Sequence, residues 1–195
     1  MHKIIVSDIF GKTKSLEKIS DSLSGTSEIF DPYDSVLKSF DTEQDAYSYF
    51  MSEVGLEKYT EKFIEYLKKF KEPVSILGFS VGASVIWKLS EDKRIHNIMG
   101  AVCFYSSQIR NYKEVRPRFP IQLIFPSHEN NFVVDTLIKE LKKNKKVTIH
   151  KSLYLHGFMN FHSENFNPVA YMRYLEPLSN VLFNKSLHTS IFTLE

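Results

Sequence analysis

The chain has 195 residues, of which 43% are hydrophobic and 25% charged, and its formal net charge is +2. This composition is typical of a globular domain with a sizeable core, and it excludes both disorder and a strong electrostatic field for nucleic acid or anionic membranes. We therefore expect one domain over residues 1–195, with a core over 1–185 and a polar tail over 186–195.

Short apolar runs alternate with helical patterns along the chain. Buried strands are predicted at residues 3–9, 27–30, 74–77, 98–105, 120–125 and 147–153. Helices are predicted at residues 15–23, 56–70, 81–89, 131–143 and 168–183, and in part over 42–55. Strands without polar alternation that are separated by helices indicate a parallel sheet covered on both faces. The fold class expected is therefore α/β, with a mostly parallel sheet.

Several absences from the sequence limit the expected cofactors and partners. Cys103 is the single cysteine, so no internal disulfide forms, and no Cys/His cluster indicates a metal. The apolar run before Ser7 is too short for a signal peptide, and the longest uncharged stretch, 74–87, is too short to span a membrane. We expect a cytoplasmic protein without metal or cofactor that binds neither nucleic acid nor membranes; its oligomeric state stays open.

The pentapeptide at residues 78–82 matches the pattern G-x-S-x-G, directly after a predicted strand and at the start of a predicted helix. This is the context of a nucleophile elbow, a sharp turn that strains its central residue and needs small neighbours such as Gly78 and Gly82. Such a turn holds the Ser80 hydroxyl above the strand ends and aims the Val81 N–H at an oxyanion. The structural alternative is a turn whose serine caps the helix.

A serine nucleophile needs a base and an acid, which follow it in the chain order Ser, acid, His in this type of fold. His156 comes after the last predicted strand, at the sheet edge where the elbow opens, so we predict it as the base, with His162 as the fallback. Glu129 is the only carboxylate in the loop after the strand at 120–125. A glutamate can orient the imidazole and stabilise its cation, as aspartate does.

These segments resemble the dienelactone hydrolase family of the α/β-hydrolase fold over residues 3–183. The likeness rests on IIVSDIFG at 4–11, LGFSVGA at 77–83, Phe104-Tyr105, PIQLIF at 120–125 and His156-Gly157-Phe158. The resemblance implies a short α/β-hydrolase fold without a lid domain, with Ser80 as nucleophile and His156 as base. It also implies an oxyanion hole from the backbone N–H groups of Ile9 and Val81, and it places Asp8 where the family often has a glutamate near the nucleophile.

The chain departs from the family pattern at two positions. Dienelactone hydrolase itself has cysteine at the elbow, so Ser80 indicates a serine-nucleophile variant. The family acid is an aspartate followed two and three residues later by an apolar pair; counted from Phe132-Val133, that position is Asn130. Either Glu129 replaces the aspartate after a shift of one residue, or Asn130 orients the histidine.

The leading functional hypothesis is a serine hydrolase that cleaves a small ester, lactone or thioester through an acyl-enzyme on Ser80. Two alternatives stay open: a catalytically degenerate binding protein, for which the missing aspartate argues, and an acyltransferase. Candidate pocket residues are Asp8, Phe10, Phe79, Tyr105, Phe158 and Phe161.

Overall fold

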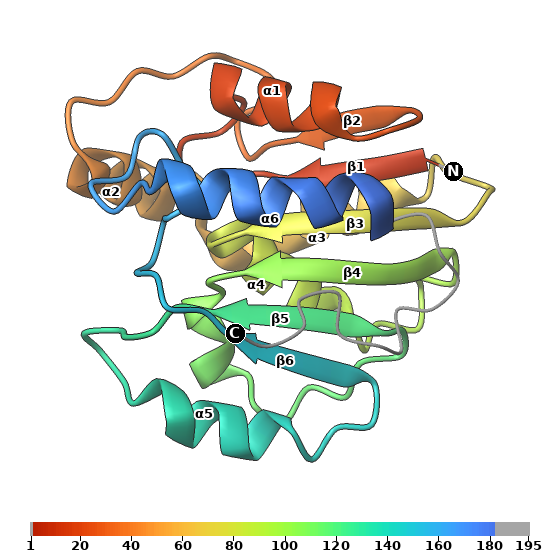
Figure 1. Cartoon of the computed structure of the whole chain (residues 1–195). Helices are drawn as coiled ribbons and strands as arrows, with labels where there is room; N and C mark the ends of the chain where they lie inside the picture. The colour runs from red at the N-terminus through yellow and green to blue at the C-terminus, as the bar shows by residue number, and fades with distance from the viewer. Residues whose placement is uncertain (1, 182–195) are drawn as a thin grey trace.

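A computed structural model describes residues 2–181, so the predicted polar tail at 186–195 and the end of the predicted last helix lie outside the described residues. Within the described part, six strands form one sheet in the order β2-β1-β3-β4-β5-β6. They are β1 (His2–Val6), β2 (Ser27–Phe30), β3 (Val74–Phe79), β4 (Ile98–Phe104), β5 (Ile121–Phe125) and β6 (Val147–Lys151). Every pairing is parallel, so the predicted parallel sheet is confirmed and all carboxyl ends lie at one edge (Figure 1).

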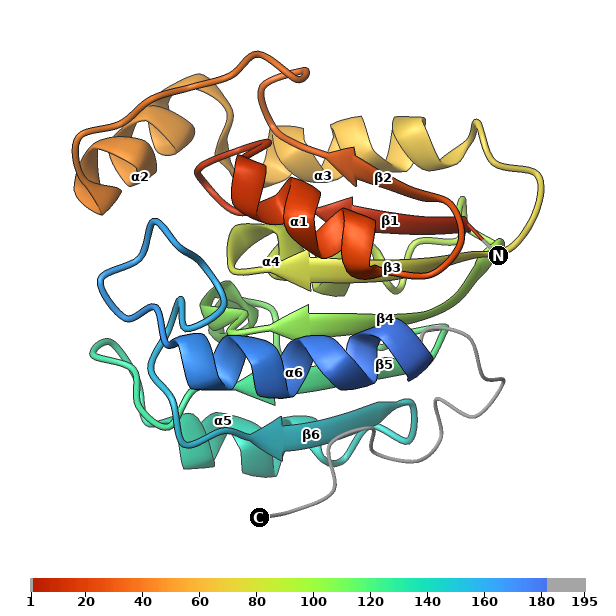
Figure 2. The same ribbon diagram turned by 45° about the horizontal axis from the view of Figure 1, so that its top comes forward.

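Helices cover both faces of this sheet (Figure 2). They are α1 (Lys14–Ser22), α2 (Glu43–Glu53), α3 (Gly55–Leu67), α4 (Val81–Leu89), α5 (Val134–Leu141) and α6 (Pro168–Val181), with a short 3₁₀ helix η1 (Ser107–Asn111). Side chains of α3, α4 and α5 share one hydrophobic cluster with the sheet, and those of α1 and α6 share a second cluster. The sheet is therefore the middle layer of three.

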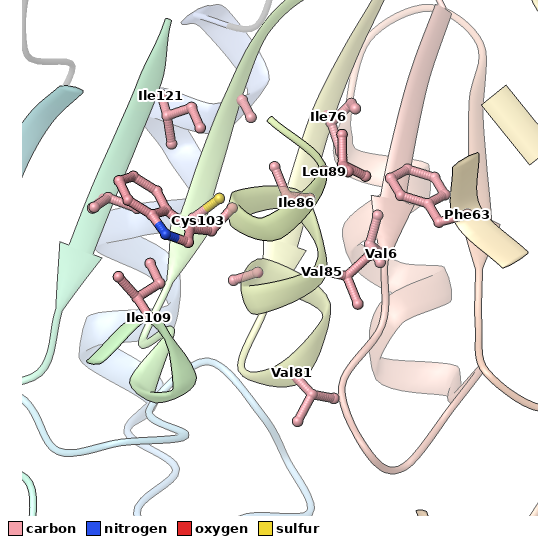
Figure 3. Close-up of a cluster of buried hydrophobic side chains, with 14 of the residues drawn as sticks. Val6, Phe63, Ile76, Val81, Val85, Ile86, Leu89, Cys103, Ile109 and Ile121 are labelled. Carbon is pink, nitrogen blue, oxygen red and sulfur yellow. The ribbon is translucent and has the colours of Figure 1, made fainter. Parts of the chain in front are cut away.

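Helix α4 lies at the centre of the larger cluster and is buried almost all round, since only Lys88 is partly exposed. Figure 3 shows Val85 and Ile86 of this helix with Val6 to one side and Cys103 to the other. Burial of each such aliphatic side chain contributes about 1.5–3 kcal/mol to folding. The first residues of α4 are thus held firmly in place at the carboxyl edge of the sheet.

The strand order reverses between β1 and β3. The chain adds β2 on one side of β1 and then continues with β3 on its other side, where Val6 lies opposite Gly78. The connections that leave these two strands run in opposite directions, and this topological switch point is where open α/β sheets bind ligands. The loop after β1 and the turn after β3 therefore lie on either side of this switch point.

Several predicted elements end earlier than the periodicity indicates, and two of them end three residues early. The strand expected to reach Ile9 stops at Val6, because a tight turn follows in which Gly11 N–H donates to Asp8 O at 3.2 Å. The helix expected to reach Phe70 ends at Leu67, and Phe70 N–H then donates to Leu67 O, three residues back, at 3.2 Å. In both places the backbone forms short-range turn hydrogen bonds in place of those that would continue the strand or the helix.

The helix predicted at 131–143 is likewise shorter, since α5 begins at Val134 after an extended Val133 and ends at Leu141. Among the helices within residues 2–181, none has the length and apolar character needed to cross a bilayer.

Replacing Gly82 with alanine is expected to lower the free energy of unfolding by about 3 kcal/mol, because the added methyl group overpacks a rigid contact. A Cβ atom at Gly82 would lie 2.4 Å from both Val6 O and Ser7 O, which are backbone atoms of the central sheet and its edge. For a domain of this size the melting temperature should fall by roughly 6–12 °C. Thermal unfolding followed by circular dichroism measures the change.

The matched control is Gly55→Ala. Gly55 has a positive φ of 70° but nothing within 4 Å of its added Cβ, so only backbone strain of about 1 kcal/mol is expected. Equal losses in the two variants would contradict the close approach of α4 to β1.

Candidate active site

The turn between β3 and α4 has the geometry of a nucleophile elbow. Ser80 has φ 50° and ψ −114°, a conformation that L residues rarely adopt. A Cβ atom at Gly78 would lie 2.4 Å from the Ile86 side chain and 2.9 Å from the Ala83 backbone, while Gly82 is pressed against β1. Ser80 occupies the N-cap position of α4, as the structural alternative expects, but its side chain makes no capping hydrogen bond to the helix.

Three side chains from separate loops form a hydrogen-bonded chain at this turn. Ser80 Oγ lies 3.1 Å from His156 Nε2, and His156 Nδ1 lies 2.7 Å from Glu129 Oε1. With the ring protonated on Nδ1, this N–H donates to the Glu129 carboxylate and leaves Nε2 free to accept the serine proton. The Glu129 side chain is only 11% exposed, which limits competition by water for this contact.

The two candidate acids differ in position. Glu129 and Asn130 are neighbours in the loop after β5, but Glu129 bonds to His156 whereas Asn130 is exposed, and no hydrogen bond within the described residues joins it to the histidine. The structure therefore brings Glu129 and not Asn130 to His156. His162 stacks on Phe10 with ring centroids 5.3 Å apart, and the contact with Ser80 comes from His156.

The loop that carries His156 is fixed by contacts that sequence reasoning missed. Asn165 Nδ2 donates to His156 O at 2.9 Å, and Asn160 N–H donates to Gly157 O at 2.8 Å. The ring of Tyr105 lies beside the imidazole, with centroids 4.9 Å apart. No local pattern marks these asparagines, because they act within an irregular loop.

The expected oxyanion donors lie at the ends of β1 and β3. Val81 is the first residue of α4, so its N–H has no acceptor inside the helix. Among the hydrogen bonds of the described loops, none uses the Ile9 N–H. Both residues flank the switch point of the sheet, and neither N–H has an acceptor among the hydrogen bonds of the described residues.

Asp8 is buried beside this turn and does not bond to Ser80 within the described residues. Its carboxylate accepts hydrogen bonds from Phe10 N–H at 3.0 Å and from Asn160 Nδ2 at 2.7 Å. Burial raises the pKa of Asp8 to about 6, and these hydrogen bonds oppose the rise. Asp8 thus ties the loop after β1 to the loop that carries His156.

Glu43, at the first position of α2, is a further carboxylate near the imidazole, besides Glu129 and Asp8, and was not expected from the sequence. Burial raises the pKa of Glu43, while the nearby His156 lowers it. Helix α2 lies at the carboxyl edge of the sheet, next to the segment between β6 and α6 (Figure 1). The side of the site formed by α2 is therefore acidic.

The aromatic candidates for the pocket divide into core and surface. Phe79 and Phe158 are at most 1% exposed and pack in the cluster between the sheet and α6, so they do not face a ligand. Side chains alternate between faces along a strand, and residue 79 points away from the larger cluster. Phe10 is also buried and packs against Phe40, whereas Phe161 is 44% exposed and stacks on Phe166.

The comparison with family models found no match. A curated relative, the uncharacterized protein YczH of Bacillus subtilis, is 37% identical over 109 residues, a match that spans 55% of this chain and only 52% of that protein. The chain therefore aligns with about half the length of this relative, whose own function its name leaves open.

Solved structures resemble this fold at low sequence identity. A dienelactone hydrolase-like promiscuous phosphotriesterase from metagenomic libraries has a TM-score of 0.64 at 11% identity, covering 93% of this chain and 84% of that one. A lipase-esterase related protein from Clostridium acetobutylicum has a TM-score of 0.64 at 10% identity, with 92% and 93% covered. Alpha/beta hydrolase domain-containing protein 10 from mouse has a TM-score of 0.63 at 10% identity, with 93% and 89% covered.

At such low identities a structural likeness shows the fold alone, and an activity has to be argued from the residues of the site. The six parallel strands, the helices on both faces and these neighbours together confirm the predicted architecture: this chain has the α/β-hydrolase fold.

Proposed function

We propose that this protein is a serine hydrolase, similar to the dienelactone hydrolase family, that cleaves a small ester, lactone or thioester. The observation that carries the proposal is the hydrogen-bonded chain from Glu129 through His156 to Ser80 at a strained elbow. Nucleophile, base and orienting acid in this order are the parts that acyl transfer to serine requires.

The reaction begins when His156 Nε2 takes the Ser80 hydroxyl proton as the oxygen attacks the carbonyl carbon of the substrate. The N–H groups of Ile9 and Val81 stabilise the resulting oxyanion. His156 then gives its proton to the leaving alcohol or thiol, and an acyl-enzyme on Ser80 remains. In the second half His156 deprotonates water as the water attacks the acyl carbonyl. The imidazolium then returns this proton to the Ser80 oxygen as the bond to the acyl group breaks and the carboxylic acid leaves.

The rival hypothesis of a degenerate binding protein rests on the missing aspartate of the family pattern. Glu129 lies at hydrogen-bond distance from His156 and supplies a carboxylate to the same ring nitrogen that a triad acid contacts. This contact supports catalysis over the binding hypothesis.

Labelling with a fluorophosphonate probe tests the proposal. The unchanged protein should form a covalent adduct on Ser80, located by mass spectrometry, because the probe traps a serine whose proton a base removes. Ser80→Ala and His156→Ala should abolish labelling. The matched control His128→Ala makes the same change at an exposed histidine next to Glu129 and should label normally. No adduct on well-folded protein would overturn the proposal in favour of a binding domain.

A further inference from the structure

A buried tyrosine contacts the loop that presents one oxyanion donor. The hydroxyl of Tyr33 donates a hydrogen bond to Ile9 O at 2.6 Å, although Tyr33 follows β2 and Ile9 follows β1. Tyr33 is 7% exposed, and its own N–H donates to Asp31 Oδ1 at 2.8 Å. Burial raises the pKa of the Tyr33 phenol, so the hydroxyl keeps the proton that it donates.

The Tyr33 contact completes a set of hydrogen bonds around two consecutive peptide groups. In the group that joins Ile9 to Phe10, the oxygen accepts from Tyr33 and the N–H donates to Asp8 Oδ1 at 3.0 Å. In the group that joins Asp8 to Ile9, the oxygen accepts from Gly11 N–H at 3.2 Å and from Ser7 Oγ at 3.2 Å. The Ile9 N–H is the only polar group of these two peptide groups that has no hydrogen-bond partner within the described residues.

These hydrogen bonds fix the direction in which the turn presents the Ile9 N–H. Residues 8–11 form a tight turn closed by the bond from Gly11 N–H, and rotation of the central peptide group is the easy motion of such a turn. Here that group, which joins Ile9 to Phe10, is held at both ends by buried side chains, so rotation would break two hydrogen bonds and leave a buried carbonyl without a partner. The preceding group carries the Ile9 N–H and is held through Asp8 O, so Tyr33 acts on this donor by fixing Ile9, the residue that the two groups share. The Tyr33 ring also packs against Gly11, since an added Cβ there would lie 2.7 Å from it.

We propose that Tyr33, through its hydrogen bond to Ile9 O, is a positioning residue that holds the Ile9 N–H in the orientation that binds the oxyanion. The inference rests on the proposed hydrolase function and adds a residue to which the sequence analysis assigns no role. Tyr33 does not touch substrate in this role. It acts on catalysis through the Asp8–Gly11 turn.

Tyr33→Phe is the matched test, because it removes the hydroxyl and keeps the ring against Gly11. With p-nitrophenyl acetate, kcat is expected to fall about 10-fold with KM unchanged, less than the 10²–10³-fold that follows complete loss of one oxyanion donor. The control is Tyr49→Phe, which makes the same change in a ring that packs edge-on against Tyr33, with centroids 5.5 Å apart. No hydrogen bond within residues 2–181 joins Tyr49 to the turn, so this control should keep the full rate.

A second measurement separates positioning from general structural damage. The thionoester analogue places sulfur, a weaker hydrogen-bond acceptor, where the oxyanion forms, so the ratio of kcat/KM for ester over thionoester reports the strength of the oxyanion hole. This ratio should shrink in Tyr33→Phe and stay constant in Tyr49→Phe. Thermal unfolding of both variants checks that the fold is intact.

The outcomes distinguish this inference from the proposed function. If the unchanged protein labels at Ser80 and Tyr33→Phe keeps its kcat, or loses kcat at a constant ester-to-thionoester ratio, the positioning role is wrong and the hydrolase proposal stands. If the unchanged protein neither labels nor turns over esters, both are overturned.

Discussion

Replacing Ser80 with alanine should lower kcat by about 10⁶, to the rate that the remaining binding groups support. The change removes only the hydroxyl that lies 3.1 Å from His156 Nε2, and the elbow backbone remains. Alanine also tolerates the strained φ of 50° no worse than serine, so the fold should persist. Initial rates of ester hydrolysis provide the test. The ester should hydrolyse slowly without enzyme, so that the low rate of the variant stands above the background.

The matching variant is His156→Ala, together with the double variant. Nucleophile and base act as one unit, so His156→Ala should cost about as much as Ser80→Ala, and the double variant should be no worse than either single change. Losses that multiply in the double variant would show that the two side chains act separately, contrary to their hydrogen bond.

Replacing Glu129 with glutamine should lower kcat by about 10⁴, the loss typical of a triad whose acid becomes an amide. Glu129 Oε1 lies 2.7 Å from His156 Nδ1, so the carboxylate both selects the ring tautomer and stabilises the imidazolium. A glutamine can donate to Nδ1 instead, which places the ring proton on Nε2, facing Ser80. The measurement is kcat of Glu129→Gln against the unchanged protein, with circular dichroism as a check on folding.

Asn130→Ala is the control for the acid, since it alters the next residue of the same loop without touching His156. Its turnover should equal that of the unchanged protein. A large loss in Asn130→Ala with normal turnover in Glu129→Gln would reverse the assignment and make the asparagine the orienting residue.

Much of the fold and the elbow could be predicted from the sequence, because their signals are local. The helix predicted at 81–89 has those bounds in the structure, since a buried apolar run between a glycine-flanked turn and a polar segment leaves little freedom. The need for glycine at positions 78 and 82 follows from the sharp turn, and the structure shows the atoms that a larger side chain would meet. The catalytic roles of Ser80, His156 and Glu129 stay predictions until they are measured.

What the sequence could not predict depends on contacts between distant segments. Asn160 and Glu43 have no periodic or motif signal, and each matters only because another loop approaches it. Phe79 illustrates the opposite error: its place beside Ser80 in the motif favours a pocket role, but the alternation of side chains along β3 turns it into the core.

The hydrogen-bonded chain at the elbow also has a consequence for synthesis. Ser80 and His156 are 76 positions apart, and the bond from Asn160 to Asp8 joins positions 152 apart. At ribosomal speeds of about 5–20 residues per second, the base emerges roughly 4–15 s after the nucleophile. A nascent chain therefore carries the serine without its base or its acid, and the proposed activity begins only when β6 and the loop after it have been added to the sheet.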